Sequence, residues 1–374
     1  MIIDGHNRIF PPLDAAAGFS SFKQKSNYIQ RQFGGHHIPV WKTGDRTRVD
    51  KRSTLLNLDN YQLNKVDWNS ELGRLNWTYQ GETYTNQYLP PSLSNQECTP
   101  ELLIREMDFA GIDMGILHPA PIFGRFNQYI LDSALRFPDR FMPVFNIDDG
   151  SISNNPESAI NEILSLIQPN VKCAVQFFSR WYYSAGNSQP WDNDLMSPYW
   201  DILAKIKTPV YFTLYNGGNR AREFDRSSQE AYLEEHRILG RWMEKYPDVK
   251  VVITHGPPWL TFMDDKKTFS FPKEFWDVFK SPNCHLQIAP VIMLGSIMEY
   301  PWKESEDSIK ECVDKIGSTR LIWGTDMPLT LRFATYRQAL NQFQKHCSFL
   351  NDNERKSILG GNAARVMGIH QYSN

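Results

Sequence analysis

The stretch PDVKVVITHGPPW, residues 247–259, shows the pattern on which the fold is predicted. A short apolar run ends at a polar residue, His255, and Gly and Pro close it. Such a run, bounded by turn residues and preceded by the helical pattern of residues 229–247, is typical of a buried strand in a parallel sheet. The sequence therefore predicts an α/β unit here.

Similar units recur along the chain. The candidate strands cover residues 1–6, 111–118, 140–147, 171–178, 208–215, 249–256, 284–291 and 320–327. Helical patterns lie between them, one of them with Thr99 as N-cap and Pro100 at its first position. Eight such strands are the number that closes a (β/α)8 barrel of the TIM type. We expect one barrel domain over residues 1–374, capped by the helical segment 352–369.

Residues 12–97 fit no strand–helix unit and are rich in Asn, Tyr, Trp, Gly and Pro. They are predicted to form a long insertion after strand one. Loops after barrel strands line the active-site mouth, so the insertion is expected to act as a lid or to supply a dimer contact. A surface excursion without a catalytic part is the alternative.

The composition indicates an ordinary globular protein. The chain has 374 residues, a formal net charge of -2 and 41% hydrophobic residues, which suggests neither a nucleic-acid nor a membrane partner. No run approaches 18 apolar residues and no signal-like N-terminus is seen, so a cytoplasmic protein is expected. The five cysteines lack C-x-x-C spacing and are expected to be reduced.

Polar residues gather where predicted strands end. Asp4, His6 and Arg8 share one face of the first strand because side chains alternate along a strand. His255 ends the sixth strand and Asp326 the eighth. Barrel active sites lie at this rim, so His6, His255 and Asp326 are predicted as catalytic residues. A packed, hydrogen-bonded imidazole is the alternative for any single histidine.

The order of motifs resembles the amidohydrolase superfamily, in the branch of the aminocarboxymuconate semialdehyde and γ-resorcylate decarboxylases. The matching pieces span nearly the whole chain outside the insertion. They are IDGHNRIFP (3–11), FPDRFMPVFNID (137–148), SPYWDILAKIKTPVYF (197–212), PDVKVVITHGPPW (247–259), RLIWGTDMP (320–328) and ILGGNAARVMGI (358–369). The resemblance implies a barrel enzyme, a small-molecule substrate and a homodimer.

The resemblance also implies one zinc or manganese ion, held by a His-x-His pair, a strand-five His and a strand-eight Asp. His6 and Asp326 match two of these ligands, and His255 matches the acid/base His after strand six. Arg8 stands at the second His of the pair, and no His occurs near Thr213. The first motif can also be aligned with the family pattern so that Asp4 and His6 form an acid-x-His pair. This alignment fits the spacing to Pro11 less well.

Because two of the four expected ligands are missing, the sequence does not decide whether a metal is bound. A metal-free mechanism is slightly favoured. In that scheme Asp326 is the general base, while His255 and His6 polarise a carbonyl. Arg8 grips a substrate carboxylate, because a guanidinium binds carboxylates bidentately. Arg220 and Arg222, in the loop after strand five, either bind the same acid or lie in solvent.

Aromatic residues of the mouth loops, Trp259 among them, suggest a flat or aromatic substrate. The leading functional prediction is hydrolysis of a small aromatic or unsaturated carboxylate that carries an ester, lactone or amide. Non-oxidative decarboxylation of such an acid is the first alternative. The second is a catalytically silent homologue that acts as a binding protein.

Overall fold

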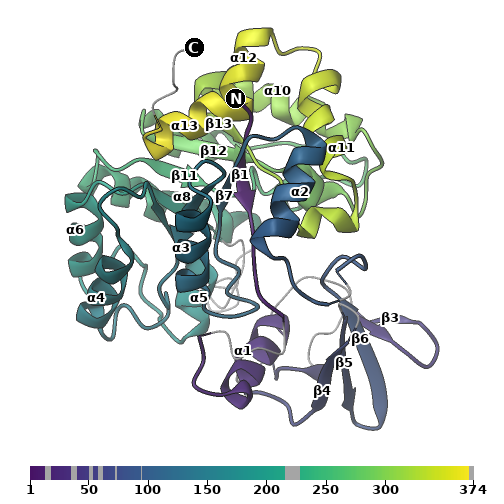
Figure 1. The fold of residues 1–374 in the computed structure, drawn as a ribbon. Coiled ribbons are helices and arrows are strands. Elements are labelled where there is room, and N and C mark those ends of the chain that lie inside the picture. Colours follow the sequence, from purple (N-terminus) through teal and green to yellow (C-terminus); the bar gives the residue numbers. More distant parts are fainter. Residues whose placement is uncertain are drawn as a thin grey trace.

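A parallel barrel forms the body of the protein in a computed structural model (Figure 1). The structure describes residues 1–12, 18–34, 40–49, 54–57, 62–71, 74–93, 95–214 and 228–369. The barrel strands, in their spatial order, are β1 (Ile3–Asn7), β7 (Met114–Leu117), β8 (Phe141–Phe145), β9 (Ala174–Phe178), β10 (Val210–Thr213), β11 (Val251–Ile253), β12 (Cys284–Ile288) and β13 (Leu321–Trp323). Each overlaps one predicted strand, so the predicted barrel is confirmed.

The sheet closes between its first and last strands. Asn7 forms a parallel bridge with Met327, and the backbone N–H of Asp326 donates to the carbonyl of His6 at 2.8 Å. Gly5 permits this approach, because a Cβ there would lie 2.6 Å from Cγ2 of Ile322. The closure therefore brings the end of β1 beside the segment that follows β13.

Helices surround the barrel as the sequence predicts. The Thr99 hydroxyl caps α2 (Pro100–Ala110) by accepting from the N–H of Leu102, and Gly111 ends it with a φ of 82°. The other outer helices are α3 (Asn127–Arg136), α4 (Pro156–Leu166), α5 (Ser179–Ser184), α6 (Ser197–Lys205), α8 (Ser228–Lys245), α9 (Pro290–Leu294), α10 (Glu306–Ile316) and α11 (Tyr336–Asn341).

The C-terminal segment seals one end of the barrel. Helix α12 (Asp352–Lys356) is followed by a kink at Gly360 and by α13 (Asn362–Met367). Ala363 and Met367 of α13 pack in one buried cluster with inward-facing strand residues such as Ile3 and Val252. Because these residues lie near the strand N-termini, the expected cap is confirmed, and it leaves the opposite end for the active site.

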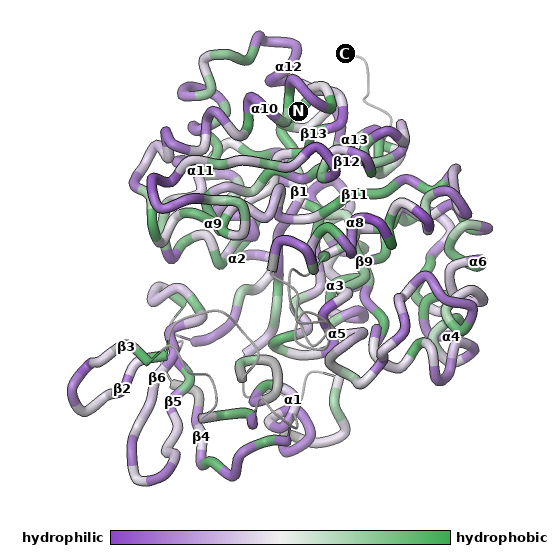
Figure 2. The backbone as a smooth tube through the Cα atoms, turned by 180° about the vertical axis from the view of Figure 1, so that it is seen from behind, coloured by the Kyte–Doolittle hydropathy of each residue, from purple (hydrophilic) through white to green (hydrophobic). Residues whose placement is uncertain are grey.

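The insertion folds into a small antiparallel unit that the sequence did not predict. It contains α1 (Phe22–Gly34) and a sheet of order β3-β2-β6-β5-β4. The strands are β2 (Val40–Lys42), β3 (Arg48–Val49), β4 (Asp67–Glu71), β5 (Arg74–Tyr79) and β6 (Glu82–Gln87). Their hairpins are drawn mostly in purple and white in Figure 2, which marks them as largely hydrophilic.

The two ends of the insertion meet at one point. Phe10 and Cys98 exchange backbone hydrogen bonds of 3.0 and 2.9 Å. Tyr88, just after β6, packs edge-on against Phe33 of α1 and against Phe123 of the loop after β7. The insertion is thereby attached at the end of the barrel toward which β1 runs, the side of the mouth (Figure 1).

No helix among the described residues is long and apolar enough to cross a bilayer. The five cysteines are all free, which agrees with the expectation of reduced thiols.

Candidate active site

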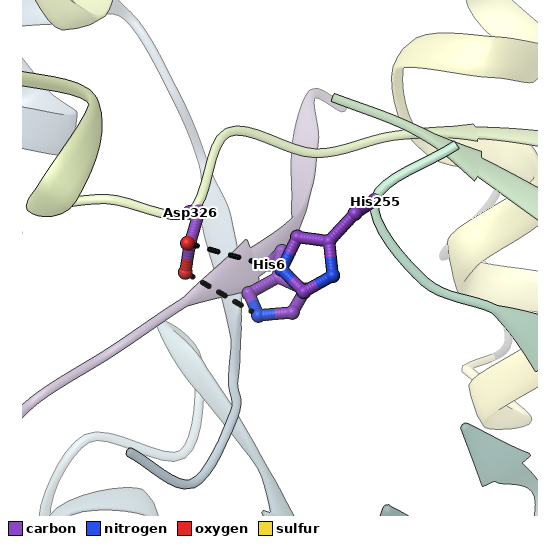
Figure 3. A group of neighbouring side chains, drawn as sticks. All are labelled: His6, His255 and Asp326. Carbon is purple, nitrogen blue, oxygen red and sulfur yellow. Dashed lines mark ion pairs between the residues drawn. The ribbon is translucent and has the colours of Figure 1, made fainter. Parts of the chain in front are cut away.

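The three residues predicted as catalytic lie together at the mouth (Figure 3). His6 comes from β1, His255 follows β11 and Asp326 follows β13. Nε2 of His6 lies 3.5 Å from Oδ1 of Asp326, and Nε2 of His255 lies 3.8 Å from its Oδ2. The two imidazole centroids are 4.6 Å apart. His6 and Asp326 are almost completely buried, whereas the His255 side chain is 19% exposed.

Arg8 lies between two members of this group. Its Nε donates to Oδ1 of Asp326, and its Nη2 donates to Nε2 of His6 at 2.9 Å. Its Nη1 donates to the carbonyl of Pro119, in the loop after β7. Arg8 is thus engaged on three sides and only 7% exposed. These contacts tie the guanidinium to the protein and leave two of its five N–H groups for a substrate atom, so its predicted grip on a substrate carboxylate stays a prediction.

The hydrogen bonds of His6 fix its tautomer. The Gln287 amide donates to the carbonyl of Gly5 at 2.8 Å, so its Oε1 faces Nδ1 of His6, also at 2.8 Å, as an acceptor. Nδ1 of His6 therefore carries the proton, and Nε2 offers a lone pair to Arg8. Burial and the nearby charges of His118, Arg8 and His255 hold the pKa of His6 well below its usual range.

A histidine that the sequence analysis did not single out completes the group. His118 follows β7 directly, is fully buried, and stacks on His6 with centroids 3.7 Å apart and planes 7° from parallel. Its Nε2 lies 2.9 Å from the carbonyl of Gly5. Burial lowers the pKa of His118 to about 3, which makes the ring neutral. The sequence did contain a signal for this residue, because His118 is the last residue of the predicted strand 111–118.

A chain of hydrogen bonds links His118 to neighbouring strands. Its Nδ1 lies 2.8 Å from Oε1 of Gln176 on β9, and Nε2 of Gln176 donates to the hydroxyl of Thr213 on β10 at 2.7 Å. The Thr213 hydroxyl lies 2.8 Å from that of Thr254, the residue before His255. These contacts link the ring of His118 to β9, β10 and the residue before His255. Thr213 therefore takes part in a structural network.

The backbone at the site is conformationally unusual. His255 has a φ of 65° and Asp326 a φ of 63°, a region that non-glycine residues seldom adopt. The N–H of His255 donates to Oε1 of Gln287 at 3.1 Å, and that of Asp326 donates to the carbonyl of His6. Strain of this kind persists where the surrounding structure over-determines it, and it is common at functional sites.

Comparison with known proteins shows the family of the chain. The family described as amidohydrolase matches residues 95–369, which is more than half of the chain. The chain belongs to the amidohydrolase family. The match begins after β1, so it leaves out His6 and Arg8. No curated protein matches the sequence.

Solved structures share the fold at low sequence identity. A 5-carboxyvanillate decarboxylase from Sphingomonas paucimobilis matches with a TM-score of 0.54 and 17% identity, over 75% of this chain and 86% of its own. A probable 2-pyrone-4,6-dicarboxylic acid hydrolase from Acinetobacter baumannii matches with a TM-score of 0.55 and 18% identity, over 73% and 90%. A zinc-bound amidohydrolase from Burkholderia multivorans gives a TM-score of 0.58 at 14% identity, over 75% and 92%.

The residues of this amidohydrolase fit a metal ion poorly. His6, His255 and Asp326 offer ligand atoms that all lie within 4.8 Å of one another. The guanidinium of Arg8, however, already bonds the Nε2 lone pair of His6 and one oxygen of Asp326. A guanidinium stays protonated and cannot ligate a cation, and its charge would repel one. With Arg8 in this position, two of the three donors are not available to a metal.

Asp326 is held as a carboxylate. Burial alone would raise its pKa, but the charge of Arg8 and the hydrogen bond and charge of His255 outweigh it and lower the pKa to about 2. So acidic a group is a weak proton acceptor near neutral pH. The sequence analysis predicted Asp326 as the general base. The geometry favours other roles: Asp326 orients His255, and His255 accepts the proton.

The remaining predicted substrate-binding residues lie elsewhere. Arg220 and Arg222 fall outside the described residues. Trp259 is fully buried, and its Nε1 donates to the hydroxyl of Ser308 at 2.8 Å. Its ring packs under Gly256, so it supports the turn after His255 and does not face a substrate, contrary to the prediction.

One cavity lies beside the candidate site and another lies far from it. One of about 570 Å³ lies at the mouth between α1, the loops after β7 and β8, and α5, with Pro119, Tyr28, Asp148 and Trp181 in its wall. Pro119 is also the residue whose carbonyl accepts from Arg8. A larger one, of about 1080 Å³, is lined by residues near the strand N-termini, His285 among them, and so lies away from the chemistry.

Proposed function

We propose that the protein is a metal-independent hydrolase that cleaves an ester, lactone or amide bond in a small carboxylate-bearing substrate. The observation that carries this proposal is the position of Arg8, bonded to both His6 and Asp326. A fixed guanidinium supplies positive charge at the point where a metal would otherwise supply it. The site then needs no ion to stabilise a developing negative charge.

His255 is the general base in this proposal. Its Nε2 faces Oδ2 of Asp326, and its Nδ1 has no hydrogen-bond partner among the described residues. With the Nε2 proton directed to Asp326, Nδ1 accepts a proton from water as the water oxygen attacks the substrate carbonyl carbon. The Asp326 carboxylate stabilises the imidazolium that forms. His255 then returns the proton to the leaving oxygen or nitrogen as the scissile bond breaks.

Arg8 stabilises the oxyanion of the tetrahedral intermediate. A guanidinium has five N–H groups, and three of those of Arg8 are used by Asp326, His6 and Pro119. The two others can donate to the carbonyl oxygen as charge develops on it, an effect worth about 3 kcal/mol per donor in buried sites. His6 and His118 hold the guanidinium in place and do not touch the substrate.

Decarboxylation of an aromatic acid is the second candidate. It is favoured by the cluster of three possible ligands, His6, His255 and Asp326, and by the fold shared with a 2,6-dihydroxybenzoate decarboxylase from Rhizobium, at 17% identity and a TM-score of 0.54. A silent binding protein is the third candidate.

Metal content and product analysis distinguish the candidates. The protein is purified without added metal, supplemented with zinc or manganese, desalted and subjected to elemental analysis beside the Asp326→Asn variant. We expect well under one ion per chain in both, and hydrolysis of an ester and lactone panel that EDTA does not inhibit. About one ion per chain, lost in the variant, with release of CO2 from aromatic acids would establish decarboxylation instead. No turnover of either panel would leave the silent homologue.

A further inference from the structure

Arg332 is a second arginine at the mouth, and its charge is not balanced. It ends the short helix η6 (Leu329–Arg332), which follows the catalytic Asp326; the N–H of Leu329 donates to the Asp326 carbonyl at 2.8 Å. Arg8 is neutralised by Asp326, and Arg125 is paired with Glu162. Arg332 forms no ion pair with any described residue.

Two aromatic rings lie beside the guanidinium of Arg332. Its Cζ lies 5.3 Å from the ring centroid of Tyr88 and 5.0 Å from that of Phe333. Its Nε donates to the carbonyl of Leu329 at 3.1 Å. Its two terminal NH2 groups have no hydrogen-bond partner among the described residues, and the side chain is only partly buried. The terminal donors, which fit a carboxylate, are thus unused by the described residues, and Nε is anchored to the backbone.

Arg332 lies within electrostatic range of the catalytic group. Burial raises the pKa of the Tyr88 hydroxyl, while the charges of Arg8 and Arg332 lower it and that of Asp326 raises it. Burial lowers the pKa of Arg332, while Tyr88 and the charge of Asp326 act in the opposite direction. Tyr88 is therefore within electrostatic range of both arginines, and its ring contacts Arg332.

We propose that Arg332, stacked on Tyr88, is a binding site for a carboxylate group of the substrate. This inference rests on the proposed function and deepens it, because it places the carboxylate on a residue other than Arg8. A planar guanidinium with two free NH2 groups matches the two oxygens of a carboxylate. The aromatic shelf keeps that fork oriented at low entropic cost. The subsite also gives the insertion a role, since the insertion supplies Tyr88.

The test measures binding and does not depend on turnover. Isothermal titration calorimetry in EDTA compares benzene-1,3-dicarboxylate with the uncharged benzamide and with inorganic phosphate. The variants are Arg332→Met and, as a matched control, Arg337→Met, which removes an exposed arginine of α11. Arg332→Lys keeps the charge but loses the fork, and thermal unfolding of each variant checks its folding.

We expect Arg332→Met to weaken dicarboxylate binding about 10- to 100-fold, the effect of losing hydrogen bonds to a charged group. Arg332→Lys should lose less, and Arg337→Met should match the wild type. Benzamide affinity should not change in any variant. Equal dicarboxylate affinity in the wild type and a folded Arg332 variant would overturn the proposal, as would no binding to the wild type or a preference for phosphate over the dicarboxylate. If metal content and CO2 release instead show a decarboxylase, the proposed hydrolase function is wrong, but the dependence of dicarboxylate binding on Arg332 is still expected.

Discussion

Nε of Arg8 donates a hydrogen bond to the carboxylate of Asp326, a residue 318 positions away in the sequence. Both side chains are more than nine-tenths buried. This pair occupies the place at which related enzymes are expected to hold a metal, and it decides the chemistry proposed for the site.

Removal of Arg8 should destabilise the protein. Arg8→Met leaves the buried charge of Asp326 unpaired, so we expect the free energy of unfolding to fall by about 3 to 5 kcal/mol. Urea denaturation at neutral pH measures it. Arg136→Met is the control, since Arg136 forms an exposed ion pair with Glu101 that should contribute less than about 1 kcal/mol. Equal losses in the two variants would contradict a structural role for the buried pair.

Conversion of Arg8 to histidine should create a metal site. Arg8→His removes the competing positive charge, frees Nε2 of His6 and adds a ligand two residues from it along β1. We expect the variant to bind about one zinc ion per chain where the wild type binds almost none. Elemental analysis after dialysis against zinc checks this, with Arg8→Met as the control that lacks the new ligand. Zinc in the wild type at the same level would show that Arg8 does not exclude the ion.

His118 should matter for turnover as well as stability. His118→Phe keeps a stacked ring but removes the contacts of the imidazole with the Gly5 carbonyl and with Oε1 of Gln176. We expect kcat to fall about tenfold with little change in KM, because Arg8 loses part of its support through His6. His285→Phe is the matched control; His285 is also buried and bonds backbone carbonyls, but at the N-terminal end of β12. An equal effect of both variants on kcat would mean that His118 acts only on stability.

Gly256 should not tolerate a side chain. It has a φ of 92°, and a Cβ there would lie 2.6 Å from the ring of Trp259. We expect Gly256→Ala to lower the free energy of unfolding by about 2 kcal/mol, and to lower kcat by displacing His255. Gly240→Ala on α8 meets no atom within 4 Å, so it should be neutral or stabilise by up to about 1 kcal/mol. Chemical denaturation and steady-state kinetics of both variants make the comparison.

The barrel could be predicted because each strand is a short apolar run closed by turn residues, and this local pattern survives in the fold. The gathering of His6, His255 and Asp326 followed from the rule that parallel strands end at one rim. The partners of Arg8 could not be predicted in this way. Its contact with Asp326 depends on the closure of β1 against β13, which no local pattern reveals.

The sheet of the insertion was missed for a different reason. Residues 74–79 alternate polar and apolar side chains, and Gln80 and Gly81, both of which have positive φ, follow directly. This is the pattern of a two-residue hairpin. A search for alternating strands and helices does not detect this hairpin, because an antiparallel hairpin has no helix between its strands.

The bridge between Phe10 and Cys98 lets the inserted segment be exchanged as a unit. The inserted chain departs from the barrel and rejoins it at one pair of residues, so its length and sequence are independent of the barrel's strand register. Exchange of this segment would replace Tyr88, and with it the surface on which Arg332 rests, while His6, Arg8, His255 and Asp326 stayed in place. Under the proposed roles, changes confined to the insertion would alter which substrate is bound and leave the residues proposed to cleave the bond unchanged.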